Sequence, residues 1–388
     1  MFTRIKSRTM RSNPLDTIVS KLQSLSEKKV TLGFDGFCDT ILKVIRAKDE
    51  DRSTSYFESI SEFGDYIIQK GEKNFSLELE ETTTKIGGNM PIMANALAQF
   101  GPKQSCIGSL GVPTIHPVFN QMPSNCELYS FANPGLTNAM EFNGRKIILA
   151  EIGALNRIEW KELKSIIGLE TIIRLFTAPD LVCLVNWSEL DNSTNFWKGL
   201  LADVLPHVPH PSKKPIGFFD LSDCSKRTGA SILEAIELLR SFSAYWNIVL
   251  SLNLNEAAII NNVLNHEKDS EGDIERIGSR LYEQLAISTV VVHYSKQALV
   301  WDSSGLHKKE SFYVANPKLS TGAGDNFNAG FCAGMLMGLD AEISLLLGHA
   351  TSGYYMTNGE SPTISELFSL LSAKLNLPIP STLQQATS

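Results

Sequence analysis

The sequence predicts an α/β protein in which a mostly parallel central sheet lies between layers of helices, with a small second β-sheet beside it. Short apolar runs alternate with amphipathic stretches, as expected for strands that are buried on both faces. These runs cover residues 30–33, 181–185, 216–219, 248–252 and 289–292. Binding sites in such sheets lie at the carboxyl ends of the strands, so the residues that follow these runs are the first candidates for function.

The second sheet is predicted from segments in which polar and apolar residues alternate. One such segment runs over 75–80, and two more flank Asn143-Gly144, a dipeptide typical of a tight hairpin turn. We expect the strands of this sheet within about 40–50, 74–86 and 126–152. An extension of the edge of the central sheet is the alternative.

Length and composition favour one large domain. The chain has 388 residues, of which 43% are hydrophobic, enough for one extensive core. We expect an N-terminal extension and first helix over 1–28, one α/β domain over 29–376 and a loose tail over 377–388. The basic residues near the N-terminus (Arg4, Lys6, Arg8, Arg11) fit a solvated chain end better than an organelle presequence.

Charge and cysteine content limit the partners and the compartment. The net charge of −7 comes without basic clusters, which argues against a nucleic-acid partner. The apolar stretch after Asp325 is shorter than the ~20 residues that span a bilayer, and we expect no membrane partner. The six cysteines include no C-x-x-C pair, and no secretory segment is present, so we expect reduced thiols and a cytoplasmic protein.

The segment 319–331 joins an anion-binding device to a candidate base. Gly322, Ala323 and Gly324 have little or no side chain, so their N–H groups can converge on a phosphate. A helix that starts here would point its positive end at the same place. Asp325 would stand beside this anion hole and could take a proton from a hydroxyl. The alternative is that Asp325 is an ordinary N-cap.

Glycines recur at every fourth position of the following helix. Gly330, Gly334 and Gly338 each cost about 1 kcal/mol relative to alanine within a helix. We therefore expect a sheet or a neighbouring helix to approach this face closely.

Two motifs carry a resemblance to a known family. Residues 321–331 resemble the C-terminal signature of the ribokinase-like (PfkB-type) carbohydrate kinases, and residues 87–101 are similar to their N-terminal signature. The likeness extends from about Val30 to near Leu375. It implies a ribokinase-like, three-layer α/β/α fold with the second sheet as a lid over a sugar, and an enzyme that uses ATP and Mg²⁺.

The acceptor site is expected after the first strand and at the double glycine. A carboxylate accepts two hydrogen bonds at once, which suits the vicinal hydroxyls of a sugar. By resemblance, Asp39 matches the sugar-binding aspartate of the family, whereas Asp35 is additional and could be a turn residue. Gly87 and Gly88 would let substrate hydroxyls approach the backbone, and Asn89 would offer its amide.

The nucleotide and metal residues are expected near three later segments. Asn253 and Glu256 are similar to the N-x-x-E motif of the family, in which the glutamate holds Mg²⁺ through water. A shifted register would leave Ala258 at the glutamate position, and a capped helix start is a further alternative. The resemblance also places Thr321 and Asn358 at the nucleotide, with the adenine near 348–359.

Four positions depart from the family pattern or leave their role open. Ile92 replaces an asparagine of many members, which points away from ordinary ribose or fructose recognition. Leu319 replaces an aspartate of members activated by monovalent cations, so we expect weak or absent K⁺ stimulation. Asp220, in a loop that runs to Arg227, is either a substrate residue or a solvated loop charge, and we assign His293 no catalytic role.

The sequence therefore predicts a kinase that transfers the γ-phosphate of ATP to a primary hydroxyl of a sugar or sugar derivative. Asp325 is the expected base, and the backbone from Gly322 to Gly324 is the expected anion hole. One alternative is a nucleoside kinase, which Phe37 or Phe142 stacked under the lid would favour. Another is a sugar or nucleotide sensor without catalysis. A homodimer through the lid is a further expectation.

Overall fold

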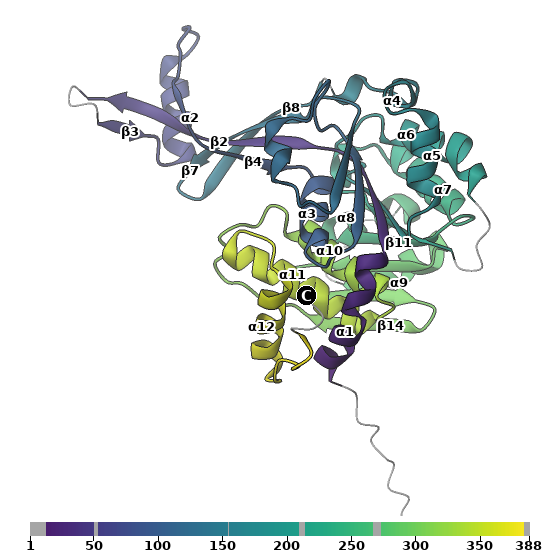
Figure 1. Cartoon of the computed structure of the whole chain (residues 1–388). Helices are drawn as coiled ribbons and strands as arrows, with labels where there is room; N and C mark the ends of the chain where they lie inside the picture. The colour runs from purple at the N-terminus through teal and green to yellow at the C-terminus, as the bar shows by residue number, and fades with distance from the viewer. Residues whose placement is uncertain (1–12, 50–52, 154, 209–213, 267–272, 384–388) are drawn as a thin grey trace, which may run out of the picture.

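A nine-stranded sheet forms the centre of the computed structural model, which describes residues 13–49, 53–153, 155–208, 214–266 and 273–383 (Figure 1). The strand order is β14-β13-β12-β11-β10-β9-β1-β5-β6. All neighbours from β6 to β12 are parallel, and β13 and β14 are antiparallel. The strands are β1 (Lys29–Phe34), β5 (Lys103–Gly108), β6 (Cys126–Ser130), β9 (Leu181–Val185), β10 (Ile216–Asp220), β11 (Asn247–Asn253), β12 (Thr289–His293), β13 (Gln297–Asp302) and β14 (Gly305–Glu310). The predicted parallel sheet is confirmed, and the five apolar runs from which it was predicted all lie in it.

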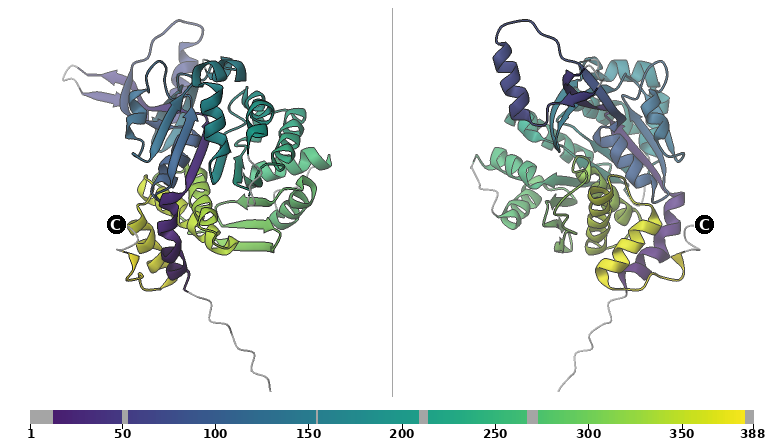
Figure 2. Two further views of the ribbon diagram at one scale, coloured as in Figure 1. Left: turned by 45° about the vertical axis from the view of Figure 1, so that its right-hand side comes forward. Right: turned by 90° about the vertical axis from the view of Figure 1, so that its left-hand side faces the viewer.

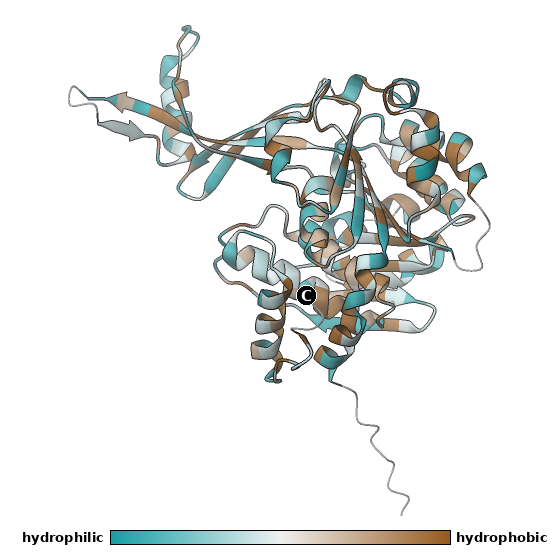
Figure 3. Cartoon of the chain, in the orientation of Figure 1, coloured by the Kyte–Doolittle hydropathy of each residue, from teal (hydrophilic) through white to brown (hydrophobic). Residues whose placement is uncertain are grey.

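Helices cover both faces of this sheet, which gives three layers (Figure 2). One face packs against α4 (Trp160–Ile167), α5 (Leu169–Thr177), α6 (Ser193–Gly199), α7 (Gly229–Phe242), α8 (Leu254–Asn265) and α9 (Ile274–Leu285). The other face packs against α1 (Pro14–Leu22), α3 (Asn89–Ala98), α10 (Ala323–Leu336), α11 (Ala341–Asn358) and α12 (Ile364–Leu375). In Figure 3 the hydrophobic colour follows the central strands and the inward sides of the helices, as burial of apolar surface requires.

The second sheet projects from the three-layer body (Figure 1). Its strands are β2 (Phe37–Lys48), β3 (Thr54–Tyr56), β4 (Leu79–Gly87), β7 (Gly135–Phe142) and β8 (Arg145–Glu151). Helix α2 (Ile60–Lys70) packs against it through Phe63, which stacks on Phe142. Strands β7 and β8 form the predicted hairpin, because Asn143 and Gly144 both adopt positive φ angles, of 40° and 83°. The second sheet is therefore separate and not an extension of the central one.

Two boundaries predicted from the sequence need correction. Strand β6 falls within the segment assigned to the second sheet, but it pairs with β5 at the edge of the central sheet. An edge strand is only half-buried, so its residue pattern is the same as that of a strand in a small exposed sheet. The predicted loose tail is also partly packed, since Leu377 and Leu383 join the core beside α12. Residues 1–12, with the basic positions of the N-terminus, and 384–388 lie outside the described part.

Two general features concern the cysteines and the helices. All six cysteines are free thiols. None of the helices in the described part of the chain has the length and apolarity needed to span a bilayer.

The glycine face of α10 packs against α11. A Cβ added at Gly330 would lie 2.5 Å from the carbonyl oxygen of Leu347, and one at Gly334 would lie 2.6 Å from Oγ of Ser344. The predicted close approach is therefore confirmed for these two glycines. Gly338 differs, because it follows the end of α10 with a φ of 63°, and a Cβ added there would meet no atom within 4 Å.

We expect Gly330→Ala to lower the free energy of unfolding by about 1–3 kcal/mol, since the added methyl has no room between the two helices. Urea denaturation measures the change. Gly64→Ala in α2 is the matched control, because no atom lies within 4 Å of the new methyl. That variant should gain up to about 1 kcal/mol. Equal effects of the two substitutions would contradict the proposed contact.

Candidate active site

The start of α10 forms the floor of a cleft at the carboxyl edge of the central sheet. Gly322 is the N-cap of this helix, with a left-handed φ of 89°, and Asp325 is therefore the third helical residue. The alternative in which Asp325 caps the helix is wrong. Its side chain is only 7% exposed, and it lines the cleft together with Gly322 and Gly324.

The amides of the glycine turn are not equivalent. Among the described residues, the N–H groups of Gly322 and Gly324 have no acceptor. The N–H of Ala323 instead donates to the carbonyl of Ser320 over 3.1 Å. Two amides, and not the predicted three, are thus available to an anion in this conformation. The positive end of α10 adds to their effect.

The cleft, of about 360 Å³, collects acidic side chains without basic ones. The carboxylates that line it are Asp39, Glu189, Asp220, Asp223, Glu256 and Asp325. The described residues that line it include no lysine or arginine. Burial raises the pKa of Asp325 well above its usual value, and the like charges of Asp220, Asp35 and Glu256 raise it further. The site is therefore suited to a ligand that brings positive charge.

The two aspartates after β1 occupy the space that the double glycine leaves open. A Cβ at Gly87 would lie 2.3 Å from Oδ1 of Asp39, and one at Gly88 would lie 2.7 Å from Oδ2 of Asp35. The glycines thus leave room for carboxylates of the protein itself, and Gly88 also lines the cleft. This close approach explains why two glycines are needed here.

Asp35 is a fully buried anchor for the start of α3. Its carboxylate accepts hydrogen bonds from the N–H of Asn89 at 2.7 Å, the N–H of Met90 at 2.8 Å and Nδ2 of Asn186 at 2.7 Å. Burial raises the pKa of Asp35 to about 6, although these hydrogen bonds favour the ionised form. With its oxygens engaged and no exposed surface, Asp35 does not line the cleft. The predicted direct substrate contact is therefore corrected to a positioning role.

Asp39 lies where the second sheet meets the cleft. It belongs to β2, and burial raises its pKa, while a hydrogen bond with Thr137 and the charges of Lys85 and Lys146 act in the opposite direction. Asn89 and Ile92 of α3 line the cleft beside it, and Nδ2 of Asn89 donates to Oγ of Ser222. These side chains give this end of the cleft both hydrogen-bond donors and hydrogen-bond acceptors.

Asn253 and Glu256 come together at the end of β11. Asn253 caps α8, and Glu256 completes a capping box by accepting from the N–H of Asn253 at 2.8 Å and from its Nδ2 at 2.6 Å. Both side chains also line the cleft, so the capped helix start and a role in the site are compatible. Burial and the neighbouring Asp220 raise the pKa of Glu256 well above its usual value. Ala258 does not line the cleft, which favours the register with Glu256.

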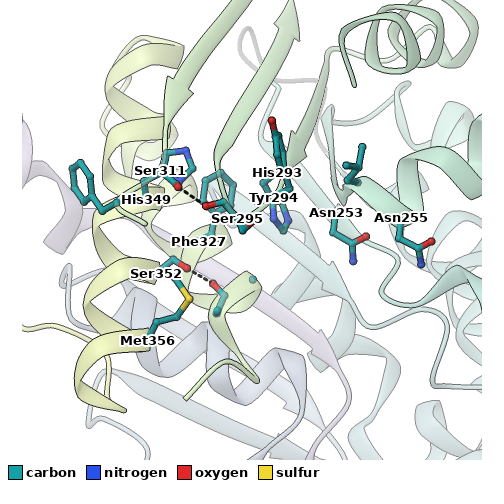
Figure 4. A pocket seen from close by; sticks show the side chains of 14 residues that line it. Asn253, Asn255, His293, Tyr294, Ser295, Ser311, Phe327, His349, Ser352 and Met356 are labelled. Atoms are coloured by element: carbon teal, nitrogen blue, oxygen red, sulfur yellow. Dashed lines mark hydrogen bonds between the residues drawn. The ribbon is translucent and has the colours of Figure 1, made fainter. Parts of the chain in front are cut away.

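A second pocket, of about 390 Å³, adjoins the cleft and shares Asn253, His293 and Gly324 with its lining (Figure 4). The rings of His293 and Phe327 pack there at a tilt of 32° with centroids 4.8 Å apart, and the ring centroid of His349 lies 5.2 Å from that of Phe327. Burial lowers the pKa of both histidines to about 4, so both rings are neutral at physiological pH. Uncharged aromatic walls of this kind fit a heteroaromatic ring.

Of the two further residues predicted to lie at the nucleotide, Thr321 lines the cleft, but Asn358 lines neither the cleft nor the second pocket.

Sequence reasoning missed Asn186 and Ser222, which line the cleft. Both adopt left-handed φ angles, of 63° and 57°. While Nδ2 of Asn186 is bound to Asp35, its Oδ1 is buried without a hydrogen-bond partner among the described residues. Their signal in the sequence is their place one and two residues after the ends of β9 and β10, where loops of a parallel sheet gather at the site.

The loop after β10 divides into two parts. Asp220 is buried in the cleft, where Asn328 donates to it at 2.6 Å, so it is not a solvated loop charge. Arg227 is directed elsewhere, since it donates to the carbonyls of residues 187, 188 and 190. Lys226 likewise pairs with Glu189. The basic residues of this loop therefore brace the neighbouring loop.

The comparison with known proteins agrees with this geometry. The sequence matches the prokaryotic ketohexokinase family over residues 14–374. The chain belongs to this family. It is 26% identical over 360 residues to a ketohexokinase of Haloferax volcanii, which spans 91% of this chain and 94% of the relative.

Solved structures share the ribokinase-like fold with this ketohexokinase-family chain. The ribokinase of Thermotoga maritima has a TM-score of 0.59 at 17% identity and covers 89% of this chain and 99% of its own. A nucleoside kinase of Methanocaldococcus jannaschii has a TM-score of 0.55 at 16% identity and covers 89% and 98%. The chain is therefore a ribokinase-like carbohydrate kinase, and family membership implies ATP as the phosphate donor.

The aromatic residues expected to stack a nucleoside are not available in this ketohexokinase-family protein. Phe37 is 8% exposed and packs against Gly135, and Phe142 is 1% exposed within the second sheet. Neither can place its ring face against a base without leaving its packing. Phe37 and Phe142 therefore do not supply the stacking that would favour a nucleoside acceptor.

We expect Asp35→Ala to lower the free energy of unfolding by about 2–4 kcal/mol, because three buried donors lose their acceptor. Asn89 and Asn186 should also lose their fixed positions, so the KM for the acceptor should rise. Asp302→Ala is the control, since this carboxylate accepts from the N–H and Oγ of Ser304 in the turn between β13 and β14 and does not line the cleft. Denaturation and steady-state kinetics measure both effects, and unchanged stability of Asp35→Ala would contradict the anchoring role.

Proposed function

We propose that the protein is an ATP-dependent kinase that phosphorylates a primary hydroxyl of a ketohexose. The observation that carries the proposal is the position of Asp325, whose carboxyl group shares one cleft with the unpaired amides of Gly322 and Gly324, as judged among the described residues. Family membership and the Haloferax volcanii relative support a ketohexose as the acceptor.

The acceptor would lie between the second sheet and the start of α3. Asp39 and Oδ1 of Asn186 can accept hydrogen bonds from sugar hydroxyls, and the amide of Asn89 can donate one. The unpartnered oxygen of Asn186 would gain the hydrogen bond that it lacks. Closure of the second sheet as a lid would exclude water, which competes with the sugar for the phosphoryl group.

Asp325 would act as the general base. Its carboxylate would take the proton of the attacking hydroxyl as the oxygen approaches the γ-phosphorus. The N–H groups of Gly322 and Gly324 would hold the charge that develops on the phosphoryl oxygens. The pocket around His293 and Phe327 would hold the adenine of ATP.

The charge of the cleft supports a requirement for Mg²⁺. An ATP triphosphate would enter a space lined by carboxylates without lysine or arginine, so a divalent cation must offset the repulsion. Glu256 would hold Mg²⁺ through water, and the bound ion would neutralise charge on the phosphates. Among the described residues no group of three or more His, Cys, Asp and Glu side chains is arranged to hold a metal ion.

The second sheet also offers a surface for a homodimer. Leu149 of β8 and Leu136 of β7 lie on one face of this sheet and are 57% and 42% exposed. Ile148 lies on the opposite face and is 57% exposed. Exposed apolar side chains on a small sheet would be covered if two copies paired through their lids.

The acceptor is identified by a panel assay. The protein is mixed with ATP and Mg²⁺, and ADP release is compared for fructose, other ketohexoses, ribose, sugar acids and adenosine. We expect the highest kcat/KM with a ketohexose and a loss of activity when Mg²⁺ is removed with EDTA. Nucleotide binding without transfer to any acceptor would instead support the sensor, and preference for adenosine would support a nucleoside kinase.

Asp325→Asn should lower kcat by about 10³-fold or more, because the amide cannot accept the proton. The KM for ATP should change little. Circular dichroism and thermal unfolding would show that the variant is folded. Turnover within a few-fold of the natural enzyme would eliminate Asp325 as the base.

The pH profile should report the acidic surroundings of Asp325. A base must be ionised, so kcat/KM should rise with pH through the pKa of this group. Asp220→Asn removes a like charge that raises the pKa of Asp325, and the rising limb should therefore move to lower pH. Asp223→Asn is the control, because Asp223 is not among the charges that shift Asp325. If the rising limb of kcat/KM in Asp220→Asn stays at the same pH or moves to higher pH, the proposed effect of Asp220 on the pKa of Asp325 is contradicted.

A further inference from the structure

Side chains of α11 hold the back of the glycine turn. The hydroxyl of Tyr355 donates to the carbonyl of Thr321 at 2.8 Å, and Oγ of Ser352 donates to the carbonyl of Ala323 at 2.9 Å. The second of these bonds is visible in Figure 4. The segment before the turn is fixed to the same helix, since the N–H of Lys318 donates to the carbonyl of Met356 at 2.8 Å.

These two hydrogen bonds determine the direction of the two available amides. In a trans peptide unit the carbonyl of one residue and the N–H of the next point in opposite directions. The carbonyl of Thr321 shares a peptide unit with the N–H of Gly322, and that of Ala323 shares one with the N–H of Gly324. Neither unit is cis. Each side-chain donor of α11 therefore turns one N–H away from the helix and toward the cleft that both glycines line.

Tyr355 is built into this contact. Its side chain is 7% exposed, and a Cβ at Gly322 would lie only 2.8 Å from its hydroxyl oxygen. The turn can therefore rest on the hydroxyl only because residue 322 is glycine. Tyr355 does not line the pocket around His293 and Phe327, whereas Ser352 does. It lines instead a pocket of about 230 Å³ together with Asp39, Ile92 and Thr321. A change at Tyr355 therefore leaves the lining of the pocket around His293 and Phe327 intact.

We propose that Tyr355 is a positioning residue for phosphoryl transfer, whose hydroxyl fixes the Thr321–Gly322 peptide so that the N–H of Gly322 faces the transferring phosphoryl group. This inference rests on the proposed function, because it assigns the free amides to the phosphate. Without the hydroxyl, the peptide unit can rotate, and the amide spends less time in the direction that the transition state needs.

The experiment compares Tyr355→Phe with Tyr354→Phe. Both changes remove one hydroxyl from neighbouring positions of α11, but the hydroxyl of Tyr354 donates to Glu366 of α12 at 2.6 Å and not to the turn. We expect Tyr355→Phe to lower kcat about tenfold with little change in the KM for ATP, as the loss of one aligned hydrogen bond predicts. Its affinity for ADP with aluminium fluoride and fructose should fall by a similar factor, while its affinity for ADP alone should not.

A second readout does not depend on activity. In the protein without ligands, deuterium exchange of a peptide that covers 318–326 should be faster in Tyr355→Phe than in the natural chain and unchanged in Tyr354→Phe. Unchanged kcat and unchanged exchange in Tyr355→Phe would overturn the inference, as would equal effects of the two variants. Absence of phosphoryl transfer by the natural chain would instead overturn the proposed function, and the exchange experiment would still decide whether Tyr355 fixes the turn.

Discussion

Burial of several carboxylates at one edge of the central sheet, without a basic partner in the cleft, is the constraint on which the site depends. The carboxylates come from different parts of the chain, yet their charges interact. The charges of Asp220 and Glu256 raise the pKa of Asp325, and the charge of Asp220 raises the pKa of Glu256. Backbone and amide donors partly compensate the charges: Asn328 binds Asp220, and Asn253 binds Glu256. Such an arrangement is unfavourable in the absence of ligands, and the cation of the proposed function would offset the repulsion when it enters with the phosphates.

Close packing of helices makes this arrangement rigid. The glycines of α10 bring its backbone against α11, and the side chains of Tyr355 and Ser352 then reach the turn that precedes α10. The same helix pair thus supports both the candidate base and the candidate anion site. A change at the interface of α10 and α11, such as a methyl group at Gly330, should therefore disturb chemistry as well as stability.

Much of the fold and part of the site could be read from the sequence. The parallel strands were predictable because fully buried strands require continuous apolar runs, and the hairpin was predictable because Asn143-Gly144 suits a turn with two positive φ angles. The place of strand β6 in the central sheet was not predictable, since a half-buried edge strand has the same residue pattern as a strand of a small exposed sheet. The direct role expected for Asp35 was wrong because two nearby aspartates can look alike in sequence while one is buried under the start of α3.

The sequence by itself determined the family, the α/β class and the segment that carries Gly322, Gly324 and Asp325, because small residues, apolar periodicity and an acid at fixed spacing are local properties of the chain. Only the tertiary structure decided which groups face the cleft. The unpartnered oxygen of Asn186, the internal hydrogen bond of Ala323 and the hydroxyl of Tyr355 behind the turn depend on how the described segments pack together. No local pattern encodes such contacts, because burial and hydrogen-bond partners are set by packing.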